Sequence, residues 1–579
     1  MSLRLKKYLR FSSVLIGVVL VHNLQAQTSQ SRSQDSIDTQ VVNIVKPYTP
    51  KISDAFKLKQ TPSLFNSETT RKAVKYTIFS IPVASTFTPA KGTSVGLEKL
   101  KKEKLFQNYT SLGYGNYGTV LGNLYLNHRL GKGERMGGYI EHHSSQGGIK
   151  GLQLQDDFSN NLVQVNYAKS SKAFVWNTDA TFQRQAVNWY GLPFETLTPI
   201  DSKQVYSTIA LGSDVQLTKG VFRTADIHLR RFSDAYESQE YHFEAESTFQ
   251  FNILESSINT LLKADYLKGT FAKQYHGLES QNYGNVQFSV APSYQYIQDD
   301  LAVLFGFKTY FLMDSERNKN AFYIYPNIEV SYAVVNSIVV AYAKIKGDLY
   351  QNNYYDFAQT NPFVSPTLDI QPSSTPYKIE VGTKGKLSHS VGYDLHGSYS
   401  SEDDKALFRT HTIKNYSTPN NYNRGNSFGI VYEDVEVITV SGALEFDVSQ
   451  KFNLRLKGDF YNYTADSKTT VWNLPEFEAF LFLDYDFSEK WNFSGTVFYS
   501  GSREDTTNFE GLFIPQPITA NVTLDSFLDA NVQLDYEITN QWGAFVKVHN
   551  IANQNYQRWN HYPVQGLQVL AGASYKFDF

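Results

Sequence analysis

Apolar and polar residues alternate with a period of two through most of the chain, from about Phe106 to Phe579. Between Leu528 and Ile538, every even position is apolar and every odd position is polar or acidic. Because successive side chains of a strand point to opposite faces, this spacing predicts strands with one apolar and one polar face. The last predicted strand alternates in the same way, with Leu570 as the exception.

The connections between the predicted strands alternate, after the first hairpin, between short joins and long loops. This alternation is typical of an outer-membrane barrel, with tight turns in the periplasm and long loops outside, whereas a soluble sandwich has no reason to keep it. Counting by this rule predicts an all-β fold, a transmembrane antiparallel β-barrel of about 22 strands over residues 106–579. The short joins lie at 218–221, 255–257, 298–300, 335–337, 388–390, 488–490 and 539–541, and the long ones at 186–202, 268–282, 351–375, 414–427, 501–526 and 551–566.

The composition agrees with a barrel and excludes other classes. Aromatic residues make up 15% of the 579 residues, as 40 Tyr, 40 Phe and 6 Trp, whereas charged residues make up only 19%. The mean hydropathy of −0.37 excludes a bundle of membrane helices, each of which needs about 18 or more consecutive apolar residues. So many aromatic residues also exclude a disordered chain. We expect the Tyr and Phe side chains to form girdles at both membrane interfaces.

The first 26 residues have the order of a secretory signal peptide. Basic residues between Arg4 and Arg10 precede an apolar run, Val14 to Val21, and a plausible cleavage site before Gln27. We therefore predict export to the outer membrane of a Gram-negative cell. Loss of the four basic residues of this segment changes the net charge from −3 to −7, which gives no sign of nucleic-acid binding. The absence of cysteine excludes disulfides, thiolate metal sites and a lipid-bearing cysteine.

Residues 27–105 lack the alternation of the rest of the chain. Five prolines interrupt their short apolar runs, and a charged stretch from Glu98 to Lys104 ends the segment. We predict a periplasmic N-terminal arm or a reduced plug, with Val74 to Phe79 as its best candidate strand.

The C-terminal sequence resembles the end of the TonB-dependent outer-membrane receptors. The stretch GAFVKVHNIANQNYQRW (543–559) contains a V-x-N-[IL] element at Val548, Asn550 and Ile551, followed by Tyr556. The stretch YPVQGLQVLAGASYKF (562–577) then supplies a Pro/Gly turn and the closing strand. The resemblance covers the barrel, and its overall style is similar to proteins of the Bacteroidota. The aromatic C-terminal end suits recognition by the barrel assembly machinery, through Tyr575, Phe577 and Phe579.

The chain departs from this family at its N-terminus. The resemblance implies a plug domain that fills the lumen, but the 79 residues between the signal peptide and the barrel are fewer than a plug usually occupies. It also implies a TonB box, a short extended segment that pairs with TonB by strand addition. The candidate is the sequence Asp38, Thr39, Gln40, Val41 and Val42; the alternative is a disordered tether.

Two stretches, 189–193 and 352–363, are rich in Trp, Tyr and Asn. Such side chains offer flat apolar faces with hydrogen-bonding tips, which suit sugars, peptides or another protein. The alternative is packing within the loops or the interfacial girdles. Our candidates for ligand contacts are Trp189, Tyr190, Tyr354, Tyr355 and Trp559.

No catalytic set is recognisable in the sequence, which lacks a cysteine nucleophile, a G-x-S-x-G elbow and an H-E-x-x-H pair. We predict no enzymatic activity, no metal site and no cofactor. Gly113, Gly115 and Gly118 match the dinucleotide fingerprint G-x-G-x-x-G, but no βαβ unit follows them. We expect these glycines to form the first tight hairpin instead.

The sequence therefore predicts a receptor-like transporter. Long outer loops would capture a ligand, and a lumen gated by the N-terminal segment would pass it inward. The expected partners are outer-membrane lipid, the barrel assembly machinery, and TonB or another periplasmic or outer-membrane protein. Two alternatives stay open, an accessory barrel within a multi-protein complex and an open porin.

Overall fold

The computed structural model describes residues 106–578, except 195–199, 254–255, 276, 278, 336–337, 415–420, 450, 468–469 and 511–517. The predicted signal peptide, the N-terminal arm, the TonB-box candidate Asp38 to Val42 and the final Phe579 lie outside the described residues.

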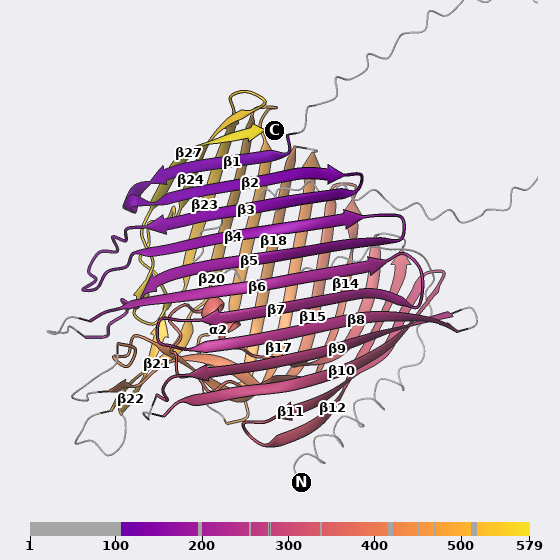
Figure 1. Cartoon of the computed structure of the whole chain (residues 1–579), viewed down its shortest axis with the longest axis horizontal. Coiled ribbons are helices and arrows are strands. Elements are labelled where there is room, and N and C mark those ends of the chain that lie inside the picture. Colours follow the sequence, from indigo (N-terminus) through magenta and orange to yellow (C-terminus); the bar gives the residue numbers. More distant parts are fainter. Residues whose placement is uncertain are drawn as a thin grey trace, which may run out of the picture. The chain divides into compact units, whose positions relative to one another are not determined.

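A closed antiparallel sheet of 22 strands dominates the described residues (Figure 1). β1 (Asn108–Gly115) pairs with β2 (Val120–Gly131) on one side and with β27 (Gln568–Phe577) on the other, so the last strand closes the ring on the first. Closure leaves no free sheet edge, which is what a barrel in lipid requires. The prediction of a barrel of about 22 strands is confirmed.

The remaining barrel strands follow one another around the ring in chain order. They are β3 (Glu134–Ser145), β4 (Phe158–Ser170), β5 (Phe174–Asn188), β6 (Lys203–Leu217), β7 (Phe222–Ser233), β8 (Gln239–Ile253), β9 (Ser256–Phe271), β10 (Gln281–Gln298), β11 (Leu301–Asp314), β12 (Lys319–Val335), β13 (Val339–Tyr350), β14 (Ser373–Ser388), β15 (Val391–Thr410), β17 (Phe428–Ser449), β18 (Phe452–Ala465), β19 (Phe477–Asp486), β20 (Trp491–Ser500), β23 (Phe527–Glu537) and β24 (Trp542–His549).

The period of two separates an outer face from an inner face of the wall. On β23, Leu528 is 52% exposed, whereas its neighbour Asp529 is 2% exposed and points inward. Leu570, the exception in the last strand, also points inward, where it packs with Leu121 and Phe545 in a small buried cluster. The apolar outer face and the polar inner face follow directly from the alternation in the sequence.

The two ends of the barrel differ in the length of their connections. At one end, short turns such as 132–133 and 299–300 join the strands; at the other, long loops such as 351–372 and 411–427 do so. We call these the short-turn end and the long-loop end. Three connections at the long-loop end are also short: η1 (Asn116–Gly118), with Gly118 at φ 60°, and the turns 234–238 and 315–318. Of the glycines predicted to form the first hairpin, Gly118 lies in the turn, and Gly113 and Gly115 lie on β1, which leads into it.

The long loops contain short elements of their own. One is α2 (Tyr354–Thr360), whose first turn is capped by the Asn353 side chain. β16 (Ile413–Lys414), β21 (Arg503–Glu510) and β22 (Ile518–Leu524) form a small separate sheet, and β25 (Gln557–Trp559) pairs with β26 (Tyr562–Pro563). Within the described ranges, no helix is long and apolar enough to cross a membrane.

Candidate functional site

Aromatic side chains from several loops meet at the long-loop end of the barrel. We call this group the aromatic cap. Its buried members come from the loops that follow β5, β13, β15 and β24 and from the first residue of β17. They are Trp189, Phe363, Tyr422, Phe428, Trp559 and Tyr562. Residues far apart in the sequence therefore form one cluster at the mouth of the barrel.

The cap is held by ring packing and by hydrogen bonds to backbone carbonyls. Phe363 and Tyr562 stack with centroids 3.6 Å apart, and Trp189 stacks on Tyr236 at 5.3 Å. The Trp189 Nε1 donates to the Pro362 carbonyl at 3.3 Å, and the Tyr562 hydroxyl donates to that of Asn426 at 2.6 Å. Each of these hydrogen bonds joins two different loops, so the loops support one another across the mouth.

The loop between β13 and β14 folds into the barrel. We call residues 351–372 the inner loop; α2 lies within it (Figure 1). Tyr354 and Val364 of this loop are completely buried, and they pack against Phe232 of β7 and other inward residues of the wall. The whole buried cluster consists of Tyr206, Phe232, Leu267, Phe271, Tyr283, Tyr354, Phe357, Ala358, Val364, Leu368 and Ile370. A loop of the long-loop end therefore packs inside the barrel, in the lumen that a plug fills in the family that the C-terminal sequence resembles.

A hairpin beside the cap is fixed by charged groups. Arg503 of β21 donates from Nη1 to the Arg558 carbonyl at 2.6 Å and from Nη2 to the Gln557 carbonyl at 2.7 Å. Asp505 accepts from the backbone N–H of Thr410 at 3.0 Å and from its hydroxyl at 2.8 Å. Burial lowers the pKa of Arg503 to about 10 and raises the pKa of Asp505 above its ordinary value. These contacts tie the hairpin both to the loop after β24 and to the end of β15.

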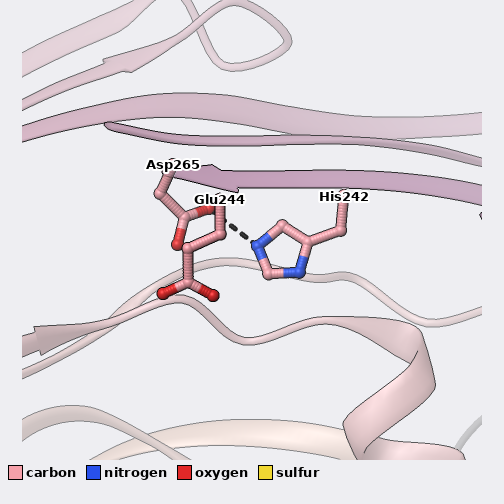
Figure 2. Close-up of side chains that lie close together, drawn as sticks. All are labelled: His242, Glu244 and Asp265. Atoms are coloured by element: carbon pink, nitrogen blue, oxygen red, sulfur yellow. Dashed lines mark hydrogen bonds and ion pairs between the residues drawn. The ribbon is translucent and has the colours of Figure 1, made fainter. Parts of the chain in front are cut away.

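One inward cluster has the residue types of a metal site. Ligand atoms of His242, Glu244 and Asp265 on β8 and β9 lie within 4.8 Å of one another (Figure 2). His242 Nε2 lies 2.8 Å from Asp265, and Arg230 lies 3.1 Å from His242 Nδ1. Because Arg230 can only donate, Nδ1 accepts and Nε2 must carry the hydrogen that points at Asp265.

Lys263 already occupies the carboxylates of this cluster. Its ammonium group pairs closely with Glu244, and lies 3.2 Å from Glu246 and 3.7 Å from Asp265. A divalent cation would have to displace this ammonium and also remove the Nε2 proton of His242. The arrangement is therefore an ion-paired network on the inner wall.

The structure places all five predicted ligand-contact residues at the long-loop end, in two groups. Trp189 and Trp559 belong to the aromatic cap, and Tyr190 packs against it. Tyr354 belongs to the cluster beneath, with Tyr355 packed on its edge. Each of the five rings contacts at least one other ring, and Arg230 also lies over the ring of Tyr355, 4.0 Å from its centroid. Of the C-terminal residues, Tyr575 and Phe577 lie on β27, with their rings stacked 5.7 Å apart.

Sequence reasoning missed the polar residues that hold the inner loop, chiefly Asp234 and Glu240. Glu240 is completely buried and Asp234 is partly buried, and both accept hydrogen bonds from Tyr354. The alternation places Glu240 on the inner face of β8, but the same holds for Glu244 and Glu246. No signal in the sequence distinguishes the carboxylate that meets a loop from those that do not.

Comparison with known proteins identifies the fold. No protein-family model and no curated protein sequence matches the chain. Among solved structures, the FrpB iron transporter of Neisseria meningitidis matches with a TM-score of 0.61 at 9% identity, over 82% of this chain and 81% of that one. The pyoverdine outer membrane receptor FpvA of Pseudomonas aeruginosa matches with a TM-score of 0.59 at 11% identity, over 82% and 78%.

A third solved structure agrees with these two. The siderophore receptor PirA of Acinetobacter baumannii matches with a TM-score of 0.57 at 12% identity, covering 81% of this chain and 80% of that one. Identities this low carry information about the fold alone. The chain shares the barrel fold of these receptors and of the iron transporter.

Proposed function

We propose that this protein is an outer-membrane, receptor-like transporter. It captures a ligand at its extracellular loops and passes it through the barrel lumen. One observation carries the proposal: the mouth of a wide, closed barrel is covered by an aromatic cap and by a loop that folds inward. A pore for free diffusion has no need of such a covering, whereas a receptor that admits a ligand on demand does. The proposed reaction is binding and conformational gating, without covalent chemistry.

The two ends of the barrel set its proposed orientation. Short turns face the periplasm and long loops face outside in bacterial outer-membrane barrels. The aromatic cap then lies on the extracellular side, where a ligand arrives. Trp189, Tyr190 and Trp559, at or beside the cap, are our proposed first contacts, and Tyr354 and Tyr355 would be reached after the cap opens. The fold likeness to siderophore receptors and an iron transporter supports transport as the general role.

We further propose that TonB supplies the energy through the segment Asp38 to Val42. Deleting residues 36–45 should abolish uptake and leave the barrel inserted and capped. Deleting residues 27–35 of the same predicted arm is the matched control, and should leave uptake intact. Growth on, or accumulation of, the transported compound is the readout. Unchanged uptake after the first deletion would reject energy coupling through this segment.

Purification from native membranes distinguishes this proposal from the accessory-barrel alternative. A receptor-like transporter should be isolated as a barrel that binds its ligand reversibly at the loops. A stoichiometric protein partner that occupies the lumen would instead contradict the transporter proposal.

A further inference from the structure

We propose that the inner loop, residues 351–372, is the gate of the lumen, and that two carboxylates, Glu240 on the wall and Asp234 in the turn between β7 and β8, form the latch that holds it closed. The inference deepens the proposed function, on which it rests for the direction of transport. The sequence led us to expect the N-terminal segment in this gating role. The contacts of the inner loop favour residues 351–372 in this role instead.

The first half of the latch is Glu240. Glu240 is completely buried, and its carboxylate accepts from the backbone N–H of Tyr354 at 2.6 Å and of Tyr355 at 3.3 Å. The hydroxyl of Tyr283 on β10 also donates to this carboxylate, at 2.8 Å. Arg230 lies 3.9 Å from this carboxylate and donates to Asn353, the residue that caps α2, at 3.0 Å. The wall therefore binds the start of α2 through charge-assisted hydrogen bonds, which are stronger than neutral ones.

The second half of the latch is Asp234, in the turn 234–238 between β7 and β8. It accepts from the Tyr354 hydroxyl at 2.8 Å, and from the backbone N–H groups of Tyr236 at 2.9 Å and Ser238 at 2.8 Å. Burial raises the pKa of Asp234, so its charge depends on these donors. The same side chain thus fixes both its own turn and the inner loop.

This turn also connects the gate to the aromatic cap. Tyr236, two residues after Asp234, stacks on Trp189 of the cap with their rings 5.3 Å apart and 9° from parallel. A ligand that draws Trp189 away from Tyr236 would therefore disturb the turn that orients Asp234. The turn 234–238 therefore contacts both the cap, through Tyr236, and the gate, through Asp234. Such a shared element can couple the two.

The geometry of the loop allows it to leave the lumen without breaking the wall. Tyr350 and Ser373, which flank it, are paired residues of β13 and β14, so the loop leaves and rejoins the wall at one point. The closed position also has a cost: Asn361 Nδ2 is buried without a hydrogen-bond partner among the described residues. A buried, unpaired donor favours the open position, where water satisfies it.

The test uses planar lipid bilayers and the absence of native cysteine. Glu240→Gln removes the charge of Glu240 while keeping the size of its side chain, and should raise the open probability of the barrel about 10- to 100-fold over wild type. Tyr354→Phe, which removes only the hydroxyl bond to Asp234, should raise it less. The milder variant also keeps the proposal testable if Glu240→Gln does not fold.

A reversible cross-link then shows whether the inner loop is the moving part. Gln359 of the loop donates to Gln185 of β5 at 2.8 Å, so cysteines at these two positions can be joined by a short bis-methanethiosulfonate, which forms a reducible disulfide with each thiol and releases methanesulfinate. In the latch variant, cross-linking should abolish the conductance and reduction should restore it. Cysteines at Asn160 and Gln183, a 2.8 Å pair on two adjacent wall strands, are the matched control and should have no effect.

Two results would overturn the gate. One is a latch variant, shown to be folded by its heat-dependent electrophoretic mobility, that conducts no more than wild type. The other is a conductance that persists when the inner loop is cross-linked. If either occurs while uptake still depends on residues 36–45, the gate is wrong and the proposed function stands. If the gate is confirmed but uptake is unchanged by deletion of residues 36–45, the proposed energy coupling through that segment is wrong instead.

Discussion

Trp189 shows at the scale of a single residue how much the cap depends on packing. The ring is completely buried, stacks on Tyr236 and donates to the Pro362 carbonyl. We expect Trp189→Ala to destabilise the cap by about 3–5 kcal/mol, the usual cost of truncating a buried aromatic residue. Proteolysis of the long loops in proteoliposomes should become faster. Trp542→Ala is the control, because Trp542 is 51% exposed on the outer face; equal cleavage of both variants would contradict the burial argument.

Lys263 offers a second test at this scale. Its ammonium group forms ion pairs with Glu244, Glu246 and Asp265 beside His242. Lys263→Ala should free these ligands, so affinity for Co²⁺ or Zn²⁺ should rise at least about tenfold, roughly 1.4 kcal/mol. Lys457→Ala, which removes the partner of Asp459 alone, is the control. The affinity for Co²⁺ or Zn²⁺ is measured by calorimetry on the purified barrel. If the wild type binds the cation as tightly as Lys263→Ala does, the lysine does not block a metal site.

Individual residues also show where prediction from the sequence succeeds. The outward position of Leu528 and the inward position of Asp529 follow from the period of two. The sequence led us to assign the aromatic residues to membrane girdles, and Tyr350, 53% exposed on the wall, fits that role. Tyr354, only four residues later, is completely buried inside the barrel. The alternation predicts which face of the wall a strand side chain points to, but it carries no information about where a loop side chain lies.

At the scale of elements, the hairpin of β21 and β22 should act as a brace for the cap. Arg503→Met removes two charge-assisted hydrogen bonds to carbonyls of the loop after β24, at an expected cost of about 2–3 kcal/mol. Cleavage by protease within residues 550–567 should therefore accelerate. Arg455→Met, which breaks an exposed ion pair with Glu445 on the wall, should change little. If the two variants behave alike, the brace is not supported.

The same hairpin explains why some elements escaped prediction. The barrel strands have an apolar face for the membrane, and this face produces the alternation that reveals them. β21 has the sequence REDTTNFE, without such a face, because it pairs above the wall with β22 and β16. From the sequence, residues 501–526 are therefore predicted to be a plain loop. A capping signal for α2, Asn353 followed by Asp356, was present in the sequence, but nothing there indicated that the helix would lie inside the barrel.

At the scale of the whole molecule, the covered mouth predicts low conductance. The inner loop contacts the wall from β5 to β10, the turn after β11, and β15 and β17. The loop after β24 touches β3 through Gln565 and Ser145. Wild-type protein in planar bilayers should therefore show no large, steady current. An open porin would conduct continuously under the same conditions, so a stable high current would contradict the closed mouth.

The most direct test of the account is an experimental density map of the full-length protein, purified from native membranes and held in lipid nanodiscs. We expect residues 351–372 inside the barrel, with Tyr354 bonded to Asp234 and Glu240 and the aromatic cap closed above them. A map in which this loop extends away from the mouth, and another protein or the N-terminal segment fills the lumen at its level, would contradict both the gate and the closed receptor.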